Sequence, residues 1–388
     1  MYLCYLNHYN IRQCEAQYLS VMYEILGKDL PTHFILNREY LKKYEKGQRW
    51  EVKWVENHWG DYRTIMGRLK LTDYTIMQKP EDLTITSYFD RAEKAPSQIL
   101  HAVVNNPNIP EEVEAIEKVL KMKKIKAGLT WVNNKCFKET LNKFNIPTIH
   151  HEMGPFRPTT YIPTIYMDFS GVNGDTEFDK RFKEFLKISD QVPILSRKEL
   201  IRTISPTHYK ELYKVLDNAE REYEIGVGLQ VEVDTNLLLF NNGYNWIDPI
   251  LAAKADSTSK VLVRPHPVAG YIMKSDSRMD IDDVTKGSAL DFINKCNKIY
   301  CLNSSVGFEA ILLGREAKIF GDSPFRNVCR MDEETQLKAL NFAVFGYLIH
   351  RDLLFNDSYY NFRLAHKGDE KGIYLDNMKR LLKNAKVN

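Results

Sequence analysis

The sequence predicts an α/β protein with two domains, each built on a parallel sheet. Its 388 residues exceed what a single hydrophobic core usually organises. Short β-branched runs alternate with longer helical patterns, most clearly after residue 260, and this alternation is typical of parallel sheets with right-handed crossovers. No repeat with a period of about 20 to 50 residues is present, which excludes solenoids and propellers.

Composition and charge narrow the class of function. Apolar residues make up 44% of the chain and charged residues 27%, as in globular proteins. The 54 Lys and Arg against 51 Asp and Glu leave a net charge of +3, too small for general nucleic-acid binding. The six cysteines form no CxxC pair, so we expect reduced thiols. Since we find no spanning apolar run and no signal-peptide pattern at Met1–Asn10, we expect a cytoplasmic protein.

The periodicity places the elements as follows. In the second half we expect strands at Lys260–Val263, Lys298–Leu302 and Ala317–Phe320, and helices at Ala289–Lys295 and Val306–Leu313. In the first half we expect a helix at Glu111–Lys124 and strands at Ile35–Leu36, Tyr74–Met77, Leu100–Val104 and Pro147–Ile149.

Polar, proline-bearing segments are the best linker candidates, at Ser189–Pro193 and Thr203–Thr207. We therefore place the domain boundary near residue 215, giving domains 1–215 and 216–388 with a cleft between them. We expect the basic, amphipathic segment Met378–Lys386 to form a last helix that packs on the body of the protein. Packing back on the first domain is one such arrangement.

A hydrophobic strand runs directly into two alternating prolines at Lys260–Pro267 (KVLVRPHP). Each proline favours an extended conformation in the residue before it, so Arg264 and His266 should point to one side. At the carboxyl end of a strand, a guanidinium beside an imidazole suits a phosphate or carboxylate. A buried, hydrogen-bonded histidine is an equally good interpretation of this motif alone.

A second strand ends at Leu302–Ser305, where a helix begins. Free backbone N–H groups, the helix dipole and the hydroxyls of Ser304 and Ser305 suit a phosphate, and Gly307 would let a ligand approach closely. Ordinary helix capping would explain the same residues. Because this turn follows RPHP by one βα unit, we expect the two turns side by side on one sheet edge, which favours a nucleotide-phosphate site.

The third motif is HHEMGPFRP, at residues 150–158. Glu152 should lie at the rim of the first domain's sheet, and Pro158 should fix the backbone of Arg157. A carboxylate and an arginine at a cleft suit an acid/base and an anion clamp. A surface ion pair of little consequence would show the same pattern.

Two acidic motifs remain. Strand-like alternation at Gly228–Thr235 (GLQVEVDT) would put Glu232 and Asp234 on one face, and the spacing does not choose between them. The segment Asp280–Asp282 (DID) has the form of a metal-binding DxD, but it lies in a polar stretch that we expect to be an exposed loop. Hard divalent ions need converging oxygen ligands, so we expect no metal there.

These motifs, in this order, resemble the bacterial capsule-polysaccharide Kdo transferases and their relatives, the retaining β-Kdo transferases of lipopolysaccharide O-antigens. The matching text is HEMGPFRPTTYIPTIYMDFSGVNG (151–174), LQVEVDT (229–235), RPHP (264–267), NSSVGFEAILLG (303–314) and IFGDSPF (319–325). The family's E-x-G-x-x-R-P commonly has an aromatic residue after its glycine, whereas here Pro155 stands there and Phe156 follows. The first 145 residues match no motif of the family.

The resemblance implies a GT-B-like fold, with two Rossmann-like domains facing across a cleft. Domain 1–215 would face the acceptor, and domain 216–388 would hold the donor, CMP-β-Kdo. The implied roles are a covalent nucleophile at Asp234 and an acid/base at Glu152, substrate binding at Arg157, Gln230 and Arg264, and nucleotide binding at His266, Ser304, Ser305 and Gly307. No metal or other cofactor is implied, since CMP is a good leaving group.

The partners implied are CMP-Kdo and a lipid-linked or polysaccharide acceptor, with no nucleic acid and at most peripheral contact at the inner face of the inner membrane. The sequence leaves open whether the chain belongs to a longer multidomain enzyme. Two other interpretations also stay open. One is another CMP-sugar transferase, such as a sialyltransferase, which shares a histidine-proline and serine-rich CMP site. The other is a non-catalytic glycan-binding subunit on the same fold.

Overall fold

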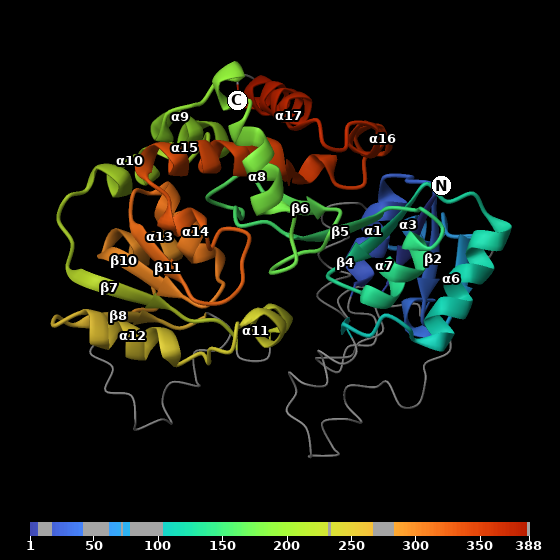
Figure 1. The fold of residues 1–388 in the computed structure, drawn as a ribbon, viewed down its shortest axis with the longest axis horizontal. Helices are drawn as coiled ribbons and strands as arrows, with labels where there is room; N and C mark the ends of the chain where they lie inside the picture. Colours follow the sequence, from blue (N-terminus) through green and yellow to red (C-terminus); the bar gives the residue numbers. More distant parts are fainter. Residues whose placement is uncertain are drawn as a thin grey trace, which may run out of the picture. The chain divides into compact units, whose positions relative to one another are not determined.

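The computed structural model describes residues 1–6, 18–41, 62–70, 73–77, 104–231, 234–266 and 283–385. The chain forms two compact units, both visible in Figure 1. Unit 1 comprises Met1–Glu152, Met167–Val172 and Asp352–Ala365, and unit 2 comprises Met153–Tyr166, Asn173–Arg351 and His366–Asn388. The single boundary expected near residue 215 differs from this division, because residue 215 lies within helix α10 (Tyr209–Asp217) of unit 2.

Unit 1 is built on a parallel sheet with the strand order β5-β4-β1-β2-β3. Tyr2 on β1 lies opposite Thr32 on β2 and Ala127 on β4. All residues of β1 and β2 are buried, as in a sheet covered on both faces. The strands are β1 (Tyr2–Tyr5), β2 (Thr32–Leu36), β3 (Tyr74–Ile76), β4 (Ala127–Trp131) and β5 (Thr148–Met153).

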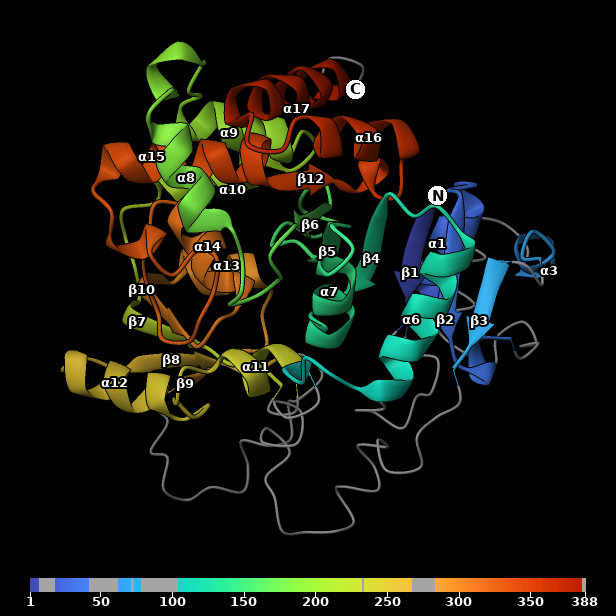
Figure 2. The same ribbon diagram turned by 45° about the vertical axis from the view of Figure 1, so that its right-hand side comes forward.

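Helices cover the sheet of unit 1 because alternate strand residues point to opposite faces. On one face Leu3 and Tyr5 pack against Ile116 of α6 and Phe137 of α7; Figure 2 shows these two helices together. On the other face Tyr2 meets Tyr360 of α16 edge-on. The helices of this unit are α1 (Leu19–Gly27), η1 (Arg38–Leu41), α3 (Tyr62–Met66), α6 (Pro110–Met122), α7 (Lys135–Asn142) and α16 (Asp357–Ala365).

Unit 2 carries a second parallel sheet with the strand order β11-β10-β7-β8-β9. Strand β7 lies at its centre, so the strands on either side of it, β10 and β8, are not neighbours. Strand β6 (Thr164–Asp168), whose residues divide between the two units, pairs antiparallel with β12 (Leu348–His350). The sheet strands are β7 (Tyr223–Gly228), β8 (Val261–Arg264), β9 (Asp283–Val284), β10 (Cys296–Cys301) and β11 (Glu316–Ile319).

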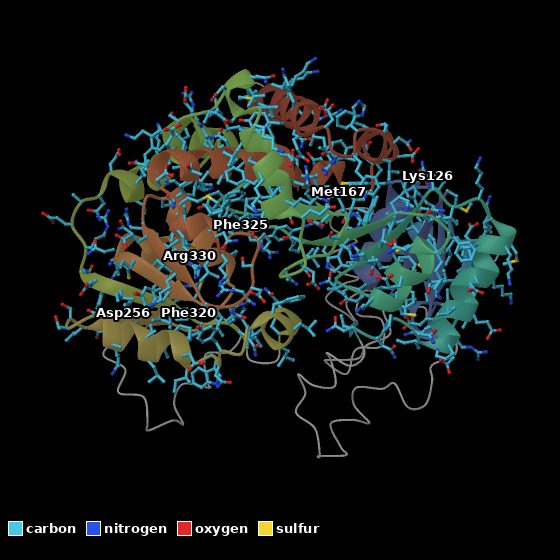
Figure 3. The ribbon with its side chains drawn as sticks, in the orientation of Figure 1. Lys126, Met167, Asp256, Phe320, Phe325 and Arg330 are labelled. Carbon is cyan, nitrogen blue, oxygen red and sulfur yellow. The ribbon has the colours of Figure 1, made fainter. Side chains whose placement is uncertain are left out.

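Helices lie on both faces of the unit 2 sheet, as Figure 1 shows. On one face Ile225 and Val227 pack with Ile250 of α12 (Asp248–Asp256). Figure 3 labels Asp256 and Phe320 on this face, where the Tyr300 hydroxyl donates to Asp256 at 2.7 Å. The other face carries α13 (Ala289–Asn294) and α14 (Ser305–Leu312).

On the sheet face that α13 covers, one position of β7 has no room for a side chain. A Cβ atom on Gly226 would lie 2.5 Å from Cys296 Sγ and 2.8 Å from the Phe292 ring, so glycine allows α13 to approach the sheet.

Helices α8 and α15 and the π-helix η7 of unit 2 share an aromatic core. Phe178, Phe182 and Phe342 pack ring against ring around Tyr347. The other helices of unit 2 are α8 (Phe178–Leu186), η4 (Ser189–Gln191), α9 (Arg197–Ile204), α10, α11 (Thr235–Phe240), η6 (Val328–Arg330), α15 (Glu333–Phe342), the π-helix η7 (Ala343–Tyr347) and α17 (Glu370–Ala385), while η8 (Arg351–Leu353) divides between the units. The last helix, α17, belongs to unit 2, whereas α16 belongs to unit 1.

The predicted α/β class with two parallel sheets is confirmed, and each unit has the covered parallel sheet of a Rossmann-like domain. The strands and helices expected after residue 260 are present within one or two residues of the predicted bounds. The expected strand at Gly228–Thr235 is wrong, because β7 ends at Gly228 and Asp234 instead begins α11. The expected strand at Leu100–Val104 falls almost entirely outside the described residues.

Candidate functional site

Three turns follow adjacent strands at the carboxyl edge of the unit 2 sheet. Strand β7 leads into Leu229–Gln230, β8 into Pro265–His266, and β10 into Leu302–Asn303. The turns after β8 and β10 do share one sheet edge, but β7 lies between them, so the expectation that they lie side by side is corrected. The consequence is that the turn carrying Gln230 occupies the middle of the edge.

The turn after β10 has the geometry of a capped helix N-terminus. Ser304 has an extended backbone, and its hydroxyl oxygen accepts from the Val306 N–H at 3.3 Å. Ser305 is the first residue of α14, and both serines are partly exposed. This end of the helix therefore presents hydroxyls and N–H groups at the edge of the sheet, as an anion site requires.

Gly307 has a different role from the one expected. It is buried, and a Cβ atom there would lie 3.0 Å from both Cys301 Sγ and Ile319 Cγ1. The missing side chain thus lets α14 pack closely on β10 and β11. The position of the absent Cβ therefore serves helix packing, and the role of Gly307 in nucleotide binding stays a prediction.

The side chains of Gln230 and Asn303 join two of the turns. Gln230 Nε2 donates to Asn303 Oδ1 at 2.8 Å, and the Asn303 N–H donates to Gln230 Oε1 at 3.1 Å. Asn303 Nδ2 also donates to the carbonyls of Asn236 and Phe240, each at 3.1 Å. The sequence analysis missed Asn303, although it is the first residue of the NSS motif and is almost fully buried.

Asp234 lies at the start of α11 and is partly exposed. Its Oδ1 atom accepts from the Asn236 N–H at 2.9 Å, which is a side-chain N-cap. Asn303 binds the carbonyl of the same Asn236, so the position of the Asp234 carboxylate depends on the end of β10. Glu232, the other acidic residue of this motif, lies outside the described residues.

Arg264 is the last residue of β8, His266 follows it after Pro265, and both are partly buried. Arg264 Nε donates to the Gly287 carbonyl at 3.0 Å, which fixes one edge of the guanidinium. Burial lowers the pKa of Arg264 from its ordinary value, although the group stays charged. Arg264 therefore presents a fixed positive charge to the same sheet edge as Gln230.

The third motif divides between the two units. Glu152 lies on β5 in unit 1, and Arg157 lies in unit 2 with the other predicted residues. Two residues after Glu152, the Gly154 N–H donates to the Thr164 carbonyl at 2.8 Å. Arg157 is exposed and donates to the Met153 carbonyl at 3.3 Å. Pro155 and Phe156, where the sequence departs from the family pattern, are buried.

One further carboxyl of this region was missed by the sequence analysis. Glu309 lies on α14, and burial raises its pKa to about 7 although the charges of Arg157 and Arg264 lower it. The hydroxyl of Tyr161 also interacts with this carboxyl. The NSSVGFE run contained Glu309, but its periodicity alone indicates only a helix.

Metal ligands do not converge in the part of the chain that the structure describes, where no group of three His, Cys, Asp or Glu side chains could hold an ion. The Asp280–Asp282 segment lies outside that part. The expectation that no metal takes part therefore stays a prediction. Likewise, no described helix has both the length and the apolar character needed to span a membrane.

Two family models match the chain. Residues 4–177 match the glycosyltransferase 99 family N-terminal domain, and residues 194–329 match the capsule polysaccharide biosynthesis protein family. These matches confirm the resemblance found in the motifs. The first match also covers the first 145 residues, where no motif of the family was found. No curated protein sequence matches the chain significantly.

Solved structures that are similar include two of KpsC from Thermosulfurimonas dismutans. The β-Kdo 2,7 transferase is 18% identical with a TM-score of 0.42, over 66% of this chain and 89% of that chain. The β-Kdo 2,4 transferase is 17% identical with a TM-score of 0.41, over 58% and 81%. A UDP-GlcNAc 2-epimerase from Methanocaldococcus jannaschii is 11% identical with a TM-score of 0.30, over 88% and 91%.

Proposed function

We propose that this glycosyltransferase of capsule polysaccharide synthesis, which is related to the Kdo transferases, moves Kdo from CMP-β-Kdo to a glycan acceptor with retention of configuration. One observation carries the proposal. Strands β8, β7 and β10 are consecutive neighbours, so Arg264, Gln230 and Ser304 belong to three adjacent turns of one sheet edge. Ligands of open α/β sheets bind at such edges.

The nucleotide would bind at the start of α14. Its phosphate would accept from the hydroxyls of Ser304 and Ser305 and from N–H groups of the first helical turn. His266, at the neighbouring strand end, would donate a further hydrogen bond to the phosphate or the cytidine. These donors stabilise the charge that develops on CMP as it leaves.

Asp234 would be the nucleophile of a double displacement. Its carboxylate forms a bond to the anomeric carbon as the bond to CMP breaks, and CMP leaves with the bonding electron pair. The acceptor hydroxyl then forms the new glycosidic bond, the bond to Asp234 breaks, and the hydroxyl proton passes to a base. Two inversions give net retention. The contact between Asn303 and the Asn236 carbonyl supports this role, because it fixes the turn that bears Asp234.

Glu152 is the proposed base, and Arg157 the proposed partner of the Kdo carboxylate. A carboxylate can accept the hydroxyl proton of the acceptor, and a guanidinium suits a carboxylate in a bidentate pair. We place the reaction in the cytoplasm, where CMP-activated sugars are made, with a lipid-linked or polysaccharide acceptor of capsule or O-antigen type.

CMP release from two donors tests the proposal. We expect the protein to release CMP from CMP-Kdo in the presence of acceptor, and to release much less from CMP-sialic acid. Release from the sialyl donor alone would contradict the Kdo assignment. The variant D234A should lose at least about a thousandfold in turnover while still binding CMP, since removing a nucleophile costs most of the chemical step.

The matched control is Asp217→Ala, which removes an exposed carboxylate paired with Lys198 on unit 2. We expect this variant to keep wild-type turnover. If the protein binds CMP and a glycan but turns over neither donor, it is a non-catalytic glycan-binding subunit instead.

A further inference from the structure

Two helices on one face of the unit 1 sheet end at a common edge. Helix α6 leads into β4, and α7 leads into β5, and these two strands are parallel neighbours. The turns that enter them are residues 123–126 and 143–147. Since the Gly128 N–H donates to the Pro147 carbonyl at 2.9 Å, the two turns lie side by side at the amino edge of the sheet.

This edge combines an anchored backbone with exposed apolar side chains. Ile125 and Ile146, one from each turn, pack on the core beneath α6 and α7. Met122, the last residue of α6, is nevertheless 59% exposed, and Phe144 is 44% exposed. The core therefore holds two large apolar side chains out towards solvent from adjacent turns.

The same edge carries a surplus of positive charge. Residues 118–126 (KVLKMKKIK) include five lysines and no acidic residue. Lys126, labelled in Figure 3, is paired at 2.7 Å with a carboxylate of α16. Lys121, Lys124 and, in the neighbouring turn, Lys143 are exposed, and none of these three forms an ion pair with another described residue. Their charges are therefore available to an anionic partner.

Unpaired ammonium groups beside exposed apolar side chains suit the surface of an anionic phospholipid bilayer. Lysine side chains place their charges at the level of the headgroup phosphates. Methionine and phenylalanine side chains can enter the boundary between the headgroups and the acyl chains. A soluble polyanion would use the lysines but would gain nothing from the apolar side chains, so the combination favours a lipid surface.

We propose that the amino edge of the unit 1 sheet docks on an anionic membrane surface. The docking surface, called the basic edge below, consists of Lys121, Met122, Lys124, Lys143 and Phe144. Each lysine that comes close to such a surface strengthens binding roughly fivefold. A few lysines and two apolar side chains give reversible, peripheral attachment, which does not depend on the reaction that the protein catalyses.

Docking through the basic edge points the strands of unit 1 away from the bilayer. Strand β4 has five residues, so the carboxyl edge of the sheet would lie about 17 Å from the basic edge. Glu152, the proposed base, lies near that carboxyl edge on β5. A lipid-linked acceptor would thus meet unit 1 through its glycan and not through its lipid. Only this consequence rests on the proposed function.

Co-sedimentation with lipid vesicles tests the docking. We expect the wild type to bind vesicles made of equal parts of phosphatidylglycerol and phosphatidylcholine, and to bind pure phosphatidylcholine vesicles much less. Raising the salt concentration from about 0.1 M to about 0.5 M should weaken binding to the anionic vesicles, because the Debye length shortens. No binding to the anionic vesicles at the lower salt concentration would overturn the proposal.

A pair of lysine substitutions locates the binding surface. The double variant Lys121→Gln/Lys124→Gln should bind the anionic vesicles about 25-fold more weakly than the wild type. The matched control is Lys180→Gln/Lys183→Gln on α8 of unit 2, whose lysines have the same spacing, are exposed and form no ion pair with another described residue. The control should bind like the wild type. An equal loss in both double variants, or no loss in the first, would refute docking through the basic edge.

A second double variant, Met122→Ser/Phe144→Ser, distinguishes a membrane from a soluble polyanion. Both side chains are exposed, so the variant should fold. It should bind the anionic vesicles about tenfold more weakly, whereas its retention on heparin should equal that of the wild type. Unchanged vesicle binding would show that the edge binds polyanions in general, and would overturn the proposal. CMP release with a soluble acceptor should be unaffected in every variant, so a wrong donor assignment would be detected separately.

Discussion

Gln230 and Asn303 hold each other through two hydrogen bonds, of 2.8 Å and 3.1 Å, across the ends of two neighbouring strands. Gln230 follows β7 and Asn303 follows β10, so the pair fixes the spacing of two turns that lie 73 residues apart in sequence. Asn303 also binds two carbonyls of α11, the helix that Asp234 begins. The pair therefore connects the proposed nucleophile to the proposed nucleotide site.

Replacing Asn303 by Ala should impair catalysis without unfolding the protein. The variant leaves the carbonyls of Asn236 and Phe240 without this donor, at a cost of about 1–3 kcal/mol in the free energy of unfolding. The turn that bears Asp234 loses its anchor, and a shift of about 1 Å can cost about 100-fold in rate. Steady-state CMP release measures the effect, with Asn327→Ala as a control that removes an exposed amide paired with Asp179. Wild-type turnover by Asn303→Ala would rule out the anchoring role.

A buried ion pair holds the last helix of unit 2. Arg181 of α8 donates to both carboxylate oxygens of Glu370 on α17, at 2.9 and 2.8 Å, and also to the Gly346 carbonyl at 2.7 Å. Glu370→Gln leaves the guanidinium charge buried without its counter-ion, so we expect a loss of about 3–5 kcal/mol in the free energy of unfolding. Urea denaturation measures this loss. The exposed pair Lys187–Glu184 supplies the control, because Glu184→Gln should cost less than about 1 kcal/mol.

Two buried histidines should make the stability of unit 1 depend on pH. Burial lowers the pKa of His150 to about 3 and that of His151 to about 4. His151 also lies between aromatic rings, with the Tyr360 hydroxyl 2.7 Å from its Nε2 atom. In the unfolded chain both groups titrate near pH 6.5. As the pH falls below 6.5, both histidines therefore bind protons in the unfolded state but stay neutral in the folded state.

The free energy of unfolding should thus be highest above pH 7 and should fall by about 2 kcal/mol per histidine by pH 5. Urea denaturation at pH 7.5 and pH 5 measures the slope. His151→Gln should flatten the slope, whatever its effect on stability at pH 7.5. An unchanged slope in that variant would show that His151 does not carry the effect.

Much of the unit 2 fold could be predicted from the sequence, because its strands are short apolar runs bounded by turns. Strand β8 (Val261–Arg264) and helix α14 (Ser305–Leu312) lie within a residue or so of the predicted bounds. Strand β7 was misplaced, because the alternation at Leu229–Asp234 imitates a strand where the chain in fact turns. The division into units was also unpredictable, because α16 joins unit 1 through contacts such as Tyr2–Tyr360, which lie far apart in sequence.

For the candidate site, the sequence identified the turns but not the links between them. Gln230 and Ser304 could be predicted because they lie in motifs at strand ends. Asn303 and Glu309 lie in the same motif, but their partners come from segments far away in sequence, which no local pattern encodes. The packing role of Gly307 was missed for the same reason, since only the packed structure shows that a side chain there would meet Ile319.

Mass spectrometry of the intact protein after brief exposure to CMP-Kdo tests the central claim most directly. A covalent intermediate predicts a mass increase of one Kdo residue, mapped by peptide sequencing to Asp234 and absent from Asp234→Ala. The same sample should contain one equivalent of free CMP for each labelled chain. Steady turnover without any adduct on Asp234, or turnover that survives in Asp234→Ala, would contradict the account.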